Sequence, residues 1–218
     1  MNKEKRGKLL PKYAVIPLLC VVILNQVVYN GAMIITKNWP HYNLEIALDR
    51  KIPFVPWTIV IYFGCYFFWI VNYILAGRQK KSLVYRFCYA EMFAKLICFA
   101  FYLLLPTTNI RPEITGNGIW EQMVVWLYQI DMPSNLFPSI HCLVSWFCFI
   151  GVRGRNDISK WYQCFSFLMA VAVFVSTLTT KQHVLVDVIG GVGIAEFCYW
   201  VSGRRNIGEK TDIYSEKN

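Results

Sequence analysis

The chain has few charged residues and no long polar stretch between its apolar segments. Asp, Glu, Lys and Arg make up 16% of its 218 residues, whereas apolar residues make up 56% and the mean hydropathy is positive. Soluble domains usually carry more charge and fewer apolar residues than this. The composition therefore argues against a soluble protein, and the length leaves no room for a separate soluble domain beside one compact bundle.

The sequence also lacks a metal-ligand spacing and a disulfide framework. Its eight cysteines all lie within or at the edges of apolar runs, where we expect them to pack as small apolar side chains. No internal repeat or low-complexity segment stands out. We expect no cofactor. We also expect no nucleic-acid partner, because in a membrane protein the net charge of +9 reflects topology first.

Apolar runs that could cross a bilayer recur along the chain. They predict an all-α, polytopic membrane bundle of about six transmembrane helices at residues 13–35, 54–76, 87–105, 137–152, 161–179 and 184–201. The first run is too long for the apolar part of a signal peptide, so we interpret it as a retained span. Residues 1–203 would form one transmembrane domain, followed by a polar cytoplasmic tail at 204–218.

Lysine and arginine are unevenly divided between the two sides that these spans define. Sixteen fall in the N-terminus, the tail and the loops after the second and fourth spans, whereas five fall in the other loops and Lys95 lies within the third span. The positive-inside rule then places both termini in the cytoplasm. Three polar stretches, near residues 108–112, 137–142 and 181–187, would converge on the outer face.

His183 and Asp187 are the first candidate pair for chemistry. Their i, i+4 spacing places them on one face of the helix that opens the sixth span. The carboxylate can accept the Nδ1–H of the imidazole, which leaves Nε2 free as a nucleophile or base. A purely structural pair at a helix end fits the same spacing, but a carboxylate at membrane depth is costly enough to favour a function.

The stretch FPSIHC offers a second set of polar groups. Pro138 suits the first turn of a helix, which would also hold Ser139 and His141. A helix N-terminus with free N–H groups and a hydroxyl can bind an anion. Arg111 in TNIRP and Lys181 add two candidate cations on the same side, and a guanidinium suits phosphate oxygens. Taken alone, a capping and interfacial role explains Ser139 and His141 equally well, and a surface role explains Arg111 better.

Residues 119–130, IWEQMVVWLYQI, have apolar positions at helical spacing and two tryptophans. This pattern predicts a short helix at the outer membrane interface, near the mouth of the site. An ordinary buried loop helix is the alternative. The glycines of GGVG at 190–193 predict close packing of the sixth span against a neighbouring helix.

In this order, RP at 111–112, PSIH at 138–141 and HVLVD at 183–187 resemble the type 2 phosphatidic acid phosphatase superfamily. The resemblance covers about residues 90–195, and FPSIHC and HVLVD are also similar to its inositol phosphorylceramide and sphingomyelin synthase branch. It implies a metal-independent lipid phosphatase in which His183 attacks phosphorus and Asp187 orients it. His141 would protonate the leaving oxygen, while Arg111 and Ser139 would hold the phosphate.

Two positions depart from the superfamily pattern. A lysine usually stands seven residues before the arginine of the first motif, where this chain has Leu104, and an arginine usually follows the serine at 176, where it has Thr177. Lys181 could replace one of these cations. Lys95 is a weaker candidate, because its i, i+4 partner Glu91 predicts a buried structural ion pair.

The leading prediction is a lipid phosphate phosphatase acting on phosphatidic acid-like or isoprenyl (di)phosphate lipids at the outer face of a membrane. The small size favours a bacterial cytoplasmic membrane. The partners would be membrane lipids, and the oligomeric state is left open. A phosphotransferase that passes a lipid headgroup to an alcohol would use the same residues. A transporter lined by Glu91, Lys95 and Asp187 and an inactive relative of the enzymes are also compatible with the sequence.

Overall fold

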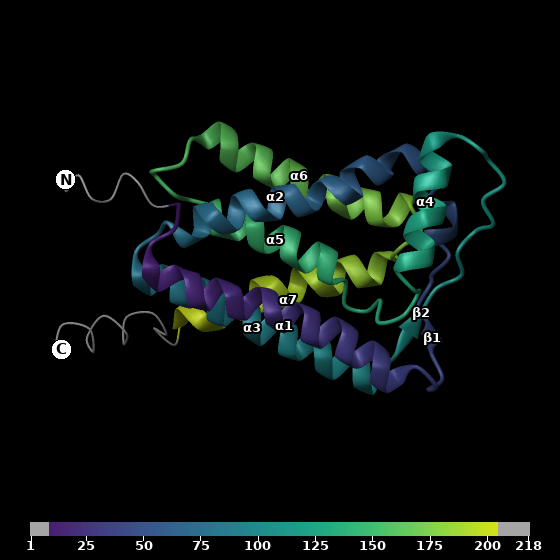
Figure 1. Cartoon of the computed structure of the whole chain (residues 1–218), viewed down its shortest axis with the longest axis horizontal. Helices are drawn as coiled ribbons and strands as arrows, with labels where there is room; N and C mark the ends of the chain where they lie inside the picture. The colour runs from purple at the N-terminus through teal and green to yellow at the C-terminus, as the bar shows by residue number, and fades with distance from the viewer. Residues whose placement is uncertain (1–8, 205–218) are drawn as a thin grey trace.

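The computed structural model describes residues 9–204, which fold into a bundle of helices (Figure 1). In chain order the elements are α1 (Lys12–Thr36), β1 (Tyr42–Asn43), η2 (Asp49–Lys51), η3 (Pro56–Thr58), α2 (Ile59–Gly77), α3 (Lys81–Leu104), β2 (Thr107–Thr108), α4 (Ile119–Ile130), α5 (Ile140–Val152), α6 (Lys160–Thr179) and α7 (Leu185–Arg204). The predicted tail beyond Arg204, and four of the five basic residues before the first span, lie outside the described residues.

Five helices are long and apolar enough to cross a membrane: α1, α2 with the preceding η3, α3, α6 and α7. Helix α5 is apolar but has only 13 residues, which corresponds to a length of about 20 Å. The predicted helical bundle is therefore confirmed, and every predicted span coincides with a helix. The outward faces of the helices expose many large apolar side chains, among them Ile16, Phe67, Trp161 and Ile189, so the structure is compatible with an integral membrane protein.

The starts of α3 and α5 differ from the positions that the sequence predicted. Helix α3 begins at Lys81, six residues before the predicted boundary, because hydropathy marks only its apolar part. The guanidinium of Arg86 in the added turns donates to the carbonyl of Tyr199 and lies 4.3 Å from its ring centroid. Pro138 precedes helix α5 instead of lying in its first turn: Ser139 is the N-cap, and its hydroxyl accepts a hydrogen bond from the N–H of Cys142.

Helix α5 lies in the middle of the bundle and packs on α2, α6, α7 and α3, whereas α1 packs mainly on α3. The start of α1 and the end of α7 lie at one end of the bundle, and β1, β2 and α4 lie at the other (Figure 1). We refer to the second as the α4 end. Helix α4 matches the predicted helix at 119–130 residue for residue and runs across the bundle (Figure 1).

Short contacts fix the start of α5 at the α4 end. Strands β1 and β2 pair in parallel, with Tyr42 opposite Thr107. The hydroxyl of Thr107 accepts hydrogen bonds from the backbone N–H groups of Leu136 and Phe137, just before α5. A Cβ on Gly191 of α7 would lie 2.6 Å from the backbone oxygen of Ser139, so only glycine allows this approach. The prediction of close packing through GGVG is confirmed at this position.

Candidate functional site

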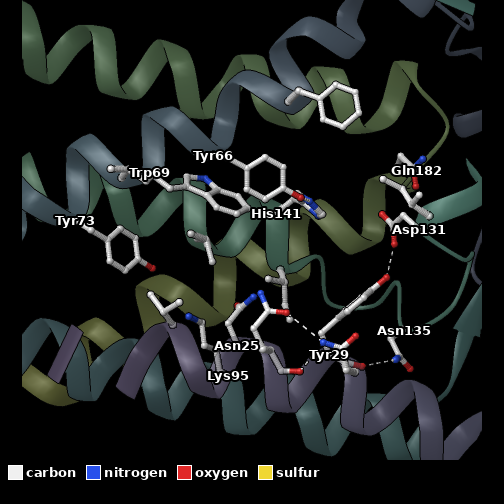
Figure 2. A pocket seen from close by; sticks show the side chains of 18 of the residues that line it. Asn25, Tyr29, Tyr66, Trp69, Tyr73, Lys95, Asp131, Asn135, His141 and Gln182 are labelled. Carbon is white, nitrogen blue, oxygen red and sulfur yellow. Dashed lines mark hydrogen bonds between the residues drawn. The ribbon is translucent and has the colours of Figure 1, made fainter. Parts of the chain in front are cut away.

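The three polar stretches that the sequence singled out meet at the α4 end of the bundle. The imidazole centroids of His141 and His183 lie 6.0 Å apart, and a guanidinium nitrogen of Arg111 lies 2.5 Å from the side-chain oxygen of Gln182. Figure 2 shows His141 and Gln182 at one end of a cavity, with Asp131 between them in the view. Residues more than 70 positions apart in the chain are thus brought together.

His183 precedes helix α7 instead of lying within it, yet it still contacts Asp187. The helix begins at Leu185, while the Nδ1 of His183 lies 3.2 Å from a carboxylate oxygen of Asp187. The same oxygen accepts the backbone N–H of Val184 at 3.0 Å, and the other oxygen has no hydrogen-bond partner in the part of the chain that the structure describes. The carboxylate therefore holds both the ring and the backbone before the helix, and it leaves Nε2 of His183 free.

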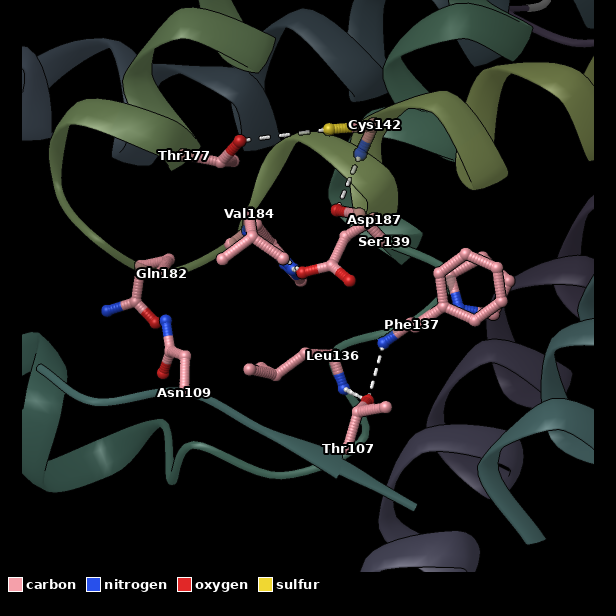
Figure 3. A network of polar contacts seen from close by, with 12 residues as sticks. Thr107, Asn109, Leu136, Phe137, Ser139, Cys142, Thr177, Gln182, Val184 and Asp187 are labelled. Atoms are coloured by element: carbon pink, nitrogen blue, oxygen red, sulfur yellow. Dashed lines mark hydrogen bonds and ion pairs between the residues drawn. The ribbon is translucent and has the colours of Figure 1, made fainter. Parts of the chain in front are cut away.

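Ser139 and Asp187 join the starts of α5 and α7. The backbone N–H of Ser139 donates to the backbone oxygen of Asp187 at 3.0 Å, and both residues are fully buried. Figure 3 shows the hydroxyl of Ser139 directed at the N–H of Cys142, whose sulfur in turn lies near Thr177. Ser139 thus acts as a helix cap in this structure, and it does not line the cavity.

His141 is surrounded by aromatic rings of α2. The centroids of Tyr62 and Trp69 lie 4.7 and 5.6 Å from that of His141, and the hydroxyl of Tyr66 lies 3.4 Å from its Nε2. This packing restricts the movement of the imidazole, which lines the cavity with its centroid 6.0 Å from that of His183.

Arg111 is held by polar groups of α4 and the loop before α7. One guanidinium nitrogen donates to the backbone oxygen of Asp131 at 2.6 Å, and a second donates to Gln182. The guanidinium also lies 4.5 Å from the ring centroid of Tyr128. Burial lowers the pKa of Arg111 and raises the pKa of Tyr128 to about 12. Arg111 does not itself line the cavity.

Lys181 is directed away from the two histidines. Its ammonium donates to the backbone oxygens of Asp49 and Ile52, at 3.1 and 2.6 Å. Its backbone adopts a φ of 55°, a conformation that is uncommon for residues other than glycine. Lys181 therefore anchors the loop before α7 to the segment around η2, and it does not take the place of a missing phosphate-binding cation here.

The other positions considered for a cation are also accounted for. Leu104 ends α3 with 82% of its surface exposed, and Thr177 is fully buried in α6. Lys95 forms the predicted buried ion pair with Glu91, at 2.9 Å. Among residues 9–204, no three His, Cys, Asp or Glu side chains are arranged so that they could hold a metal ion.

Two residues that the sequence analysis missed, Gln182 and Asp131, line the cavity beside the histidines. Gln182 is 1% exposed, and its side-chain oxygen accepts a hydrogen bond from Arg111, while its side-chain nitrogen has no partner among the residues described. The carboxylate of Asp131 accepts hydrogen bonds from the hydroxyls of Tyr29 on α1 and Tyr62 on α2. The sequence offered one signal for Gln182, its position next to His183. It offered none for Asp131, because the tyrosines that contact its carboxylate lie about 70 and 100 residues away.

The cavity has a volume of about 620 Å³ and extends from the histidines along α1 and α2. Its lining away from the histidines is mostly aliphatic and aromatic, with Val15, Leu19 and Val22 on α1 and Ile70 and Ile74 on α2. On α1 the lining runs from Val15 to Asn30, a rise of about 22 Å. The arrangement combines two imidazoles and an amide at one end with a long apolar channel.

Comparison of the chain with models of protein families, with curated proteins and with solved structures found no match. The resemblance to the type 2 phosphatidic acid phosphatase superfamily thus remains a prediction based on its short motifs. A functional assignment for the chain therefore depends on the geometry around His141 and His183.

Proposed function

We propose that the chain is an integral-membrane lipid phosphate phosphatase that acts through a phosphohistidine intermediate. The observation that carries this proposal is the pair of imidazoles 6.0 Å apart, one of them held by a carboxylate, at the end of a long apolar cavity. A phosphate between the rings would be flanked by a nucleophile and a proton donor, while the lipid chain follows the cavity.

In the first step, Nε2 of His183 attacks phosphorus and forms a P–N bond while the bond from phosphorus to the lipid oxygen breaks. His141 gives its proton to that oxygen, so the lipid leaves as an alcohol. In the second step, His141 removes a proton from water, the hydroxide attacks phosphorus, and the P–N bond breaks. Inorganic phosphate leaves, and both histidines return to their starting states. Asp187 holds the tautomer of His183 throughout.

Gln182 is the protein group best placed to donate to a phosphate oxygen. Gln182 lines the cavity, its side-chain nitrogen is buried without a partner among residues 9–204, and Arg111 fixes the amide by donating to its oxygen. In this role Arg111 acts through Gln182 and not by direct contact with the substrate. Ser139 acts likewise by fixing the start of α5.

A phosphotransferase that passes the phospho-headgroup to an alcohol is the second candidate, and the charge of the site favours it. Arg111 contacts Gln182, the neighbour of His183, but does not line the cavity, whereas Asp131 places a carboxylate in the cavity lining. Such a site suits a phosphodiester, which carries one negative charge, better than a phosphomonoester, which carries up to two.

The sidedness follows from the sequence. The positive-inside rule places both termini in the cytoplasm, and the α4 end, with both histidines, would then face outward. We propose a bacterial cytoplasmic membrane as the location of the chain, on the basis of its small size.

The test is phosphate release from a panel of lipid phosphates and diphosphates by the chain purified in detergent with EDTA present. We expect release by the wild type, loss to background in His183→Ala, and full retention in His41→Ala. His41 is a matched control because it lies in the loop after α1 and does not line the cavity. No release by the wild type would favour the transferase, which an added alcohol acceptor then tests. Unchanged release by His183→Ala would show that the site is wrong.

A further inference from the structure

A second group of polar side chains lies deeper in the same cavity, among its apolar lining. It consists of Asn25 on α1, Tyr73 on α2, and Glu91 and Lys95 on α3, and we refer to it as the mid-cavity cluster. Asn25, Tyr73 and Lys95 line the cavity, and Figure 2 shows Asn25 beside Lys95. The catalytic scheme above uses none of these residues.

The polar groups of the mid-cavity cluster are only partly satisfied by the protein. The ammonium of Lys95 has three donors, and it contacts the backbone oxygen of Val21 at 3.1 Å and Glu91 at 2.9 Å. Within the described residues, the side-chain oxygen of Asn25 and the second carboxylate oxygen of Glu91 are buried without a hydrogen-bond partner. Glu91 and Lys95 are at most 1% exposed. Unpaired buried groups of this kind are costly unless a ligand completes them.

The distance of the cluster from the histidines follows from the helix rise. On α1, Tyr29 reaches Asp131 beside the histidines and Val21 accepts from Lys95, a separation of about 12 Å along the axis. On α2, Tyr66 contacts His141 and Tyr73 donates to Glu91, a separation of roughly 10 Å. A lipid chain attached to a phosphate between the histidines would therefore pass the cluster on the order of 10 Å further along.

We propose that the mid-cavity cluster binds a hydroxyl or amide group carried by the lipid chain of the substrate. This inference rests on the proposed function for the position of the phosphate. The side-chain oxygen of Asn25 requires an O–H or N–H donor, while Lys95 can donate to the oxygen of the same group. An ester offers no donor, and an isoprenyl chain would place hydrocarbon against the ammonium. The cluster thus selects hydroxylated or amide-bearing chains over isoprenyl phosphates.

The test measures binding, so it does not depend on turnover. Radiolabelled hexadecyl phosphate is compared with hexadecyl phosphates that carry one hydroxyl at successive carbons, using the His183→Ala protein in detergent. We expect one hydroxyl position in the chain interior to bind about tenfold more tightly than the plain chain. Adding Asn25→Leu should remove most of this preference. Adding Asn30→Leu should preserve it, because Asn30 lies nearer the histidine end of α1, where its amide donates to Gln26.

Equal binding of all hydroxylated and plain chains would overturn the inference. A preference that survives Asn25→Leu would overturn it too, because the hydroxyl would then bind elsewhere. The two proposals fail separately. Phosphate release by the wild type without a hydroxyl preference would contradict only the role of the cluster. A hydroxyl preference without any phosphoryl chemistry in the wild type would contradict only the proposed function.

Discussion

The Glu91–Lys95 ion pair allows the cost of an unpaired charge inside this bundle to be measured. Its atoms lie 2.9 Å apart, and its side chains are 0% and 2% exposed. An effective dielectric constant of about 20 gives an attraction of roughly 6 kcal/mol at that distance. Removal of both charges from water offsets a large part of this attraction.

Lys95→Met removes the ammonium and leaves the carboxylate of Glu91 with the hydroxyl of Tyr73 as its remaining side-chain partner. We expect this variant to lose about 3–5 kcal/mol of unfolding free energy, because an unpaired charge stays buried. The double variant that also carries Glu91→Gln should recover most of the loss, to within about 1 kcal/mol of the wild type. The neutral amide can still accept a hydrogen bond from Tyr73.

The matched control is the pair formed by Arg153 and Glu196, whose atoms lie 2.6 Å apart but whose side chains are 40% and 38% exposed. Arg153→Met should cost at most about 1 kcal/mol, because water screens an exposed pair. Unfolding of all variants is followed by SDS titration of the detergent-solubilised proteins. If Lys95→Met destabilises the chain no more than Arg153→Met does, or if the double variant is less stable than Lys95→Met alone, the reasoning from burial is refuted.

Two further predictions concern the candidate site. Asp187→Asn should lower kcat for phosphate release by about 10²–10⁴-fold, because an amide no longer fixes the tautomer of His183. Asp157→Asn, whose side chain is 68% exposed beside Arg155, should leave kcat unchanged, and similar rates for both variants would contradict the role of Asp187. Gln182→Leu should lower kcat/KM by about 10²-fold, which is the scale of one lost hydrogen-bond donor to a developing charge. Gln122→Leu, on the exposed face of α4, should change kcat/KM less than twofold. Equal values for the two variants would exclude donation by Gln182.

The helices were predictable from the sequence because hydropathy depends on each segment alone. The predicted spans coincide with six helices, and the amphipathic segment at 119–130 forms α4. The boundaries that failed are those set by partners elsewhere in the chain. Lys81 to Arg86 are helical against Tyr199, about 110 residues away, and the start of α5 depends on the hydroxyl of Ser139 rather than on the fixed φ of Pro138.

The part of the site that depends on residues close together in the sequence was also predictable. His183 and Asp187 are four residues apart, so local spacing was sufficient to predict their contact. Asp131 could not be identified in this way, because its carboxylate has a neighbour only once Tyr29 and Tyr62 arrive from α1 and α2. Lys181 shows the reverse case: its place in the sequence suggested a phosphate ligand, but its left-handed backbone directs the ammonium to Asp49 and Ile52.

The charge balance near the two histidines has a consequence for both candidate reactions. Arg111 supplies positive charge, and its guanidinium contacts Gln182 and the backbone carbonyl of Asp131. The side chain of Asp131 supplies negative charge, and this residue lines the cavity. A dianionic phosphate would therefore meet hydrogen-bond donors but little compensating charge. Its binding should weaken as its second proton is lost, whereas binding of a phosphodiester should not change over the same pH range. The pH dependence of KM for a monoester and a diester therefore distinguishes a site built for phosphate release from one built for headgroup transfer.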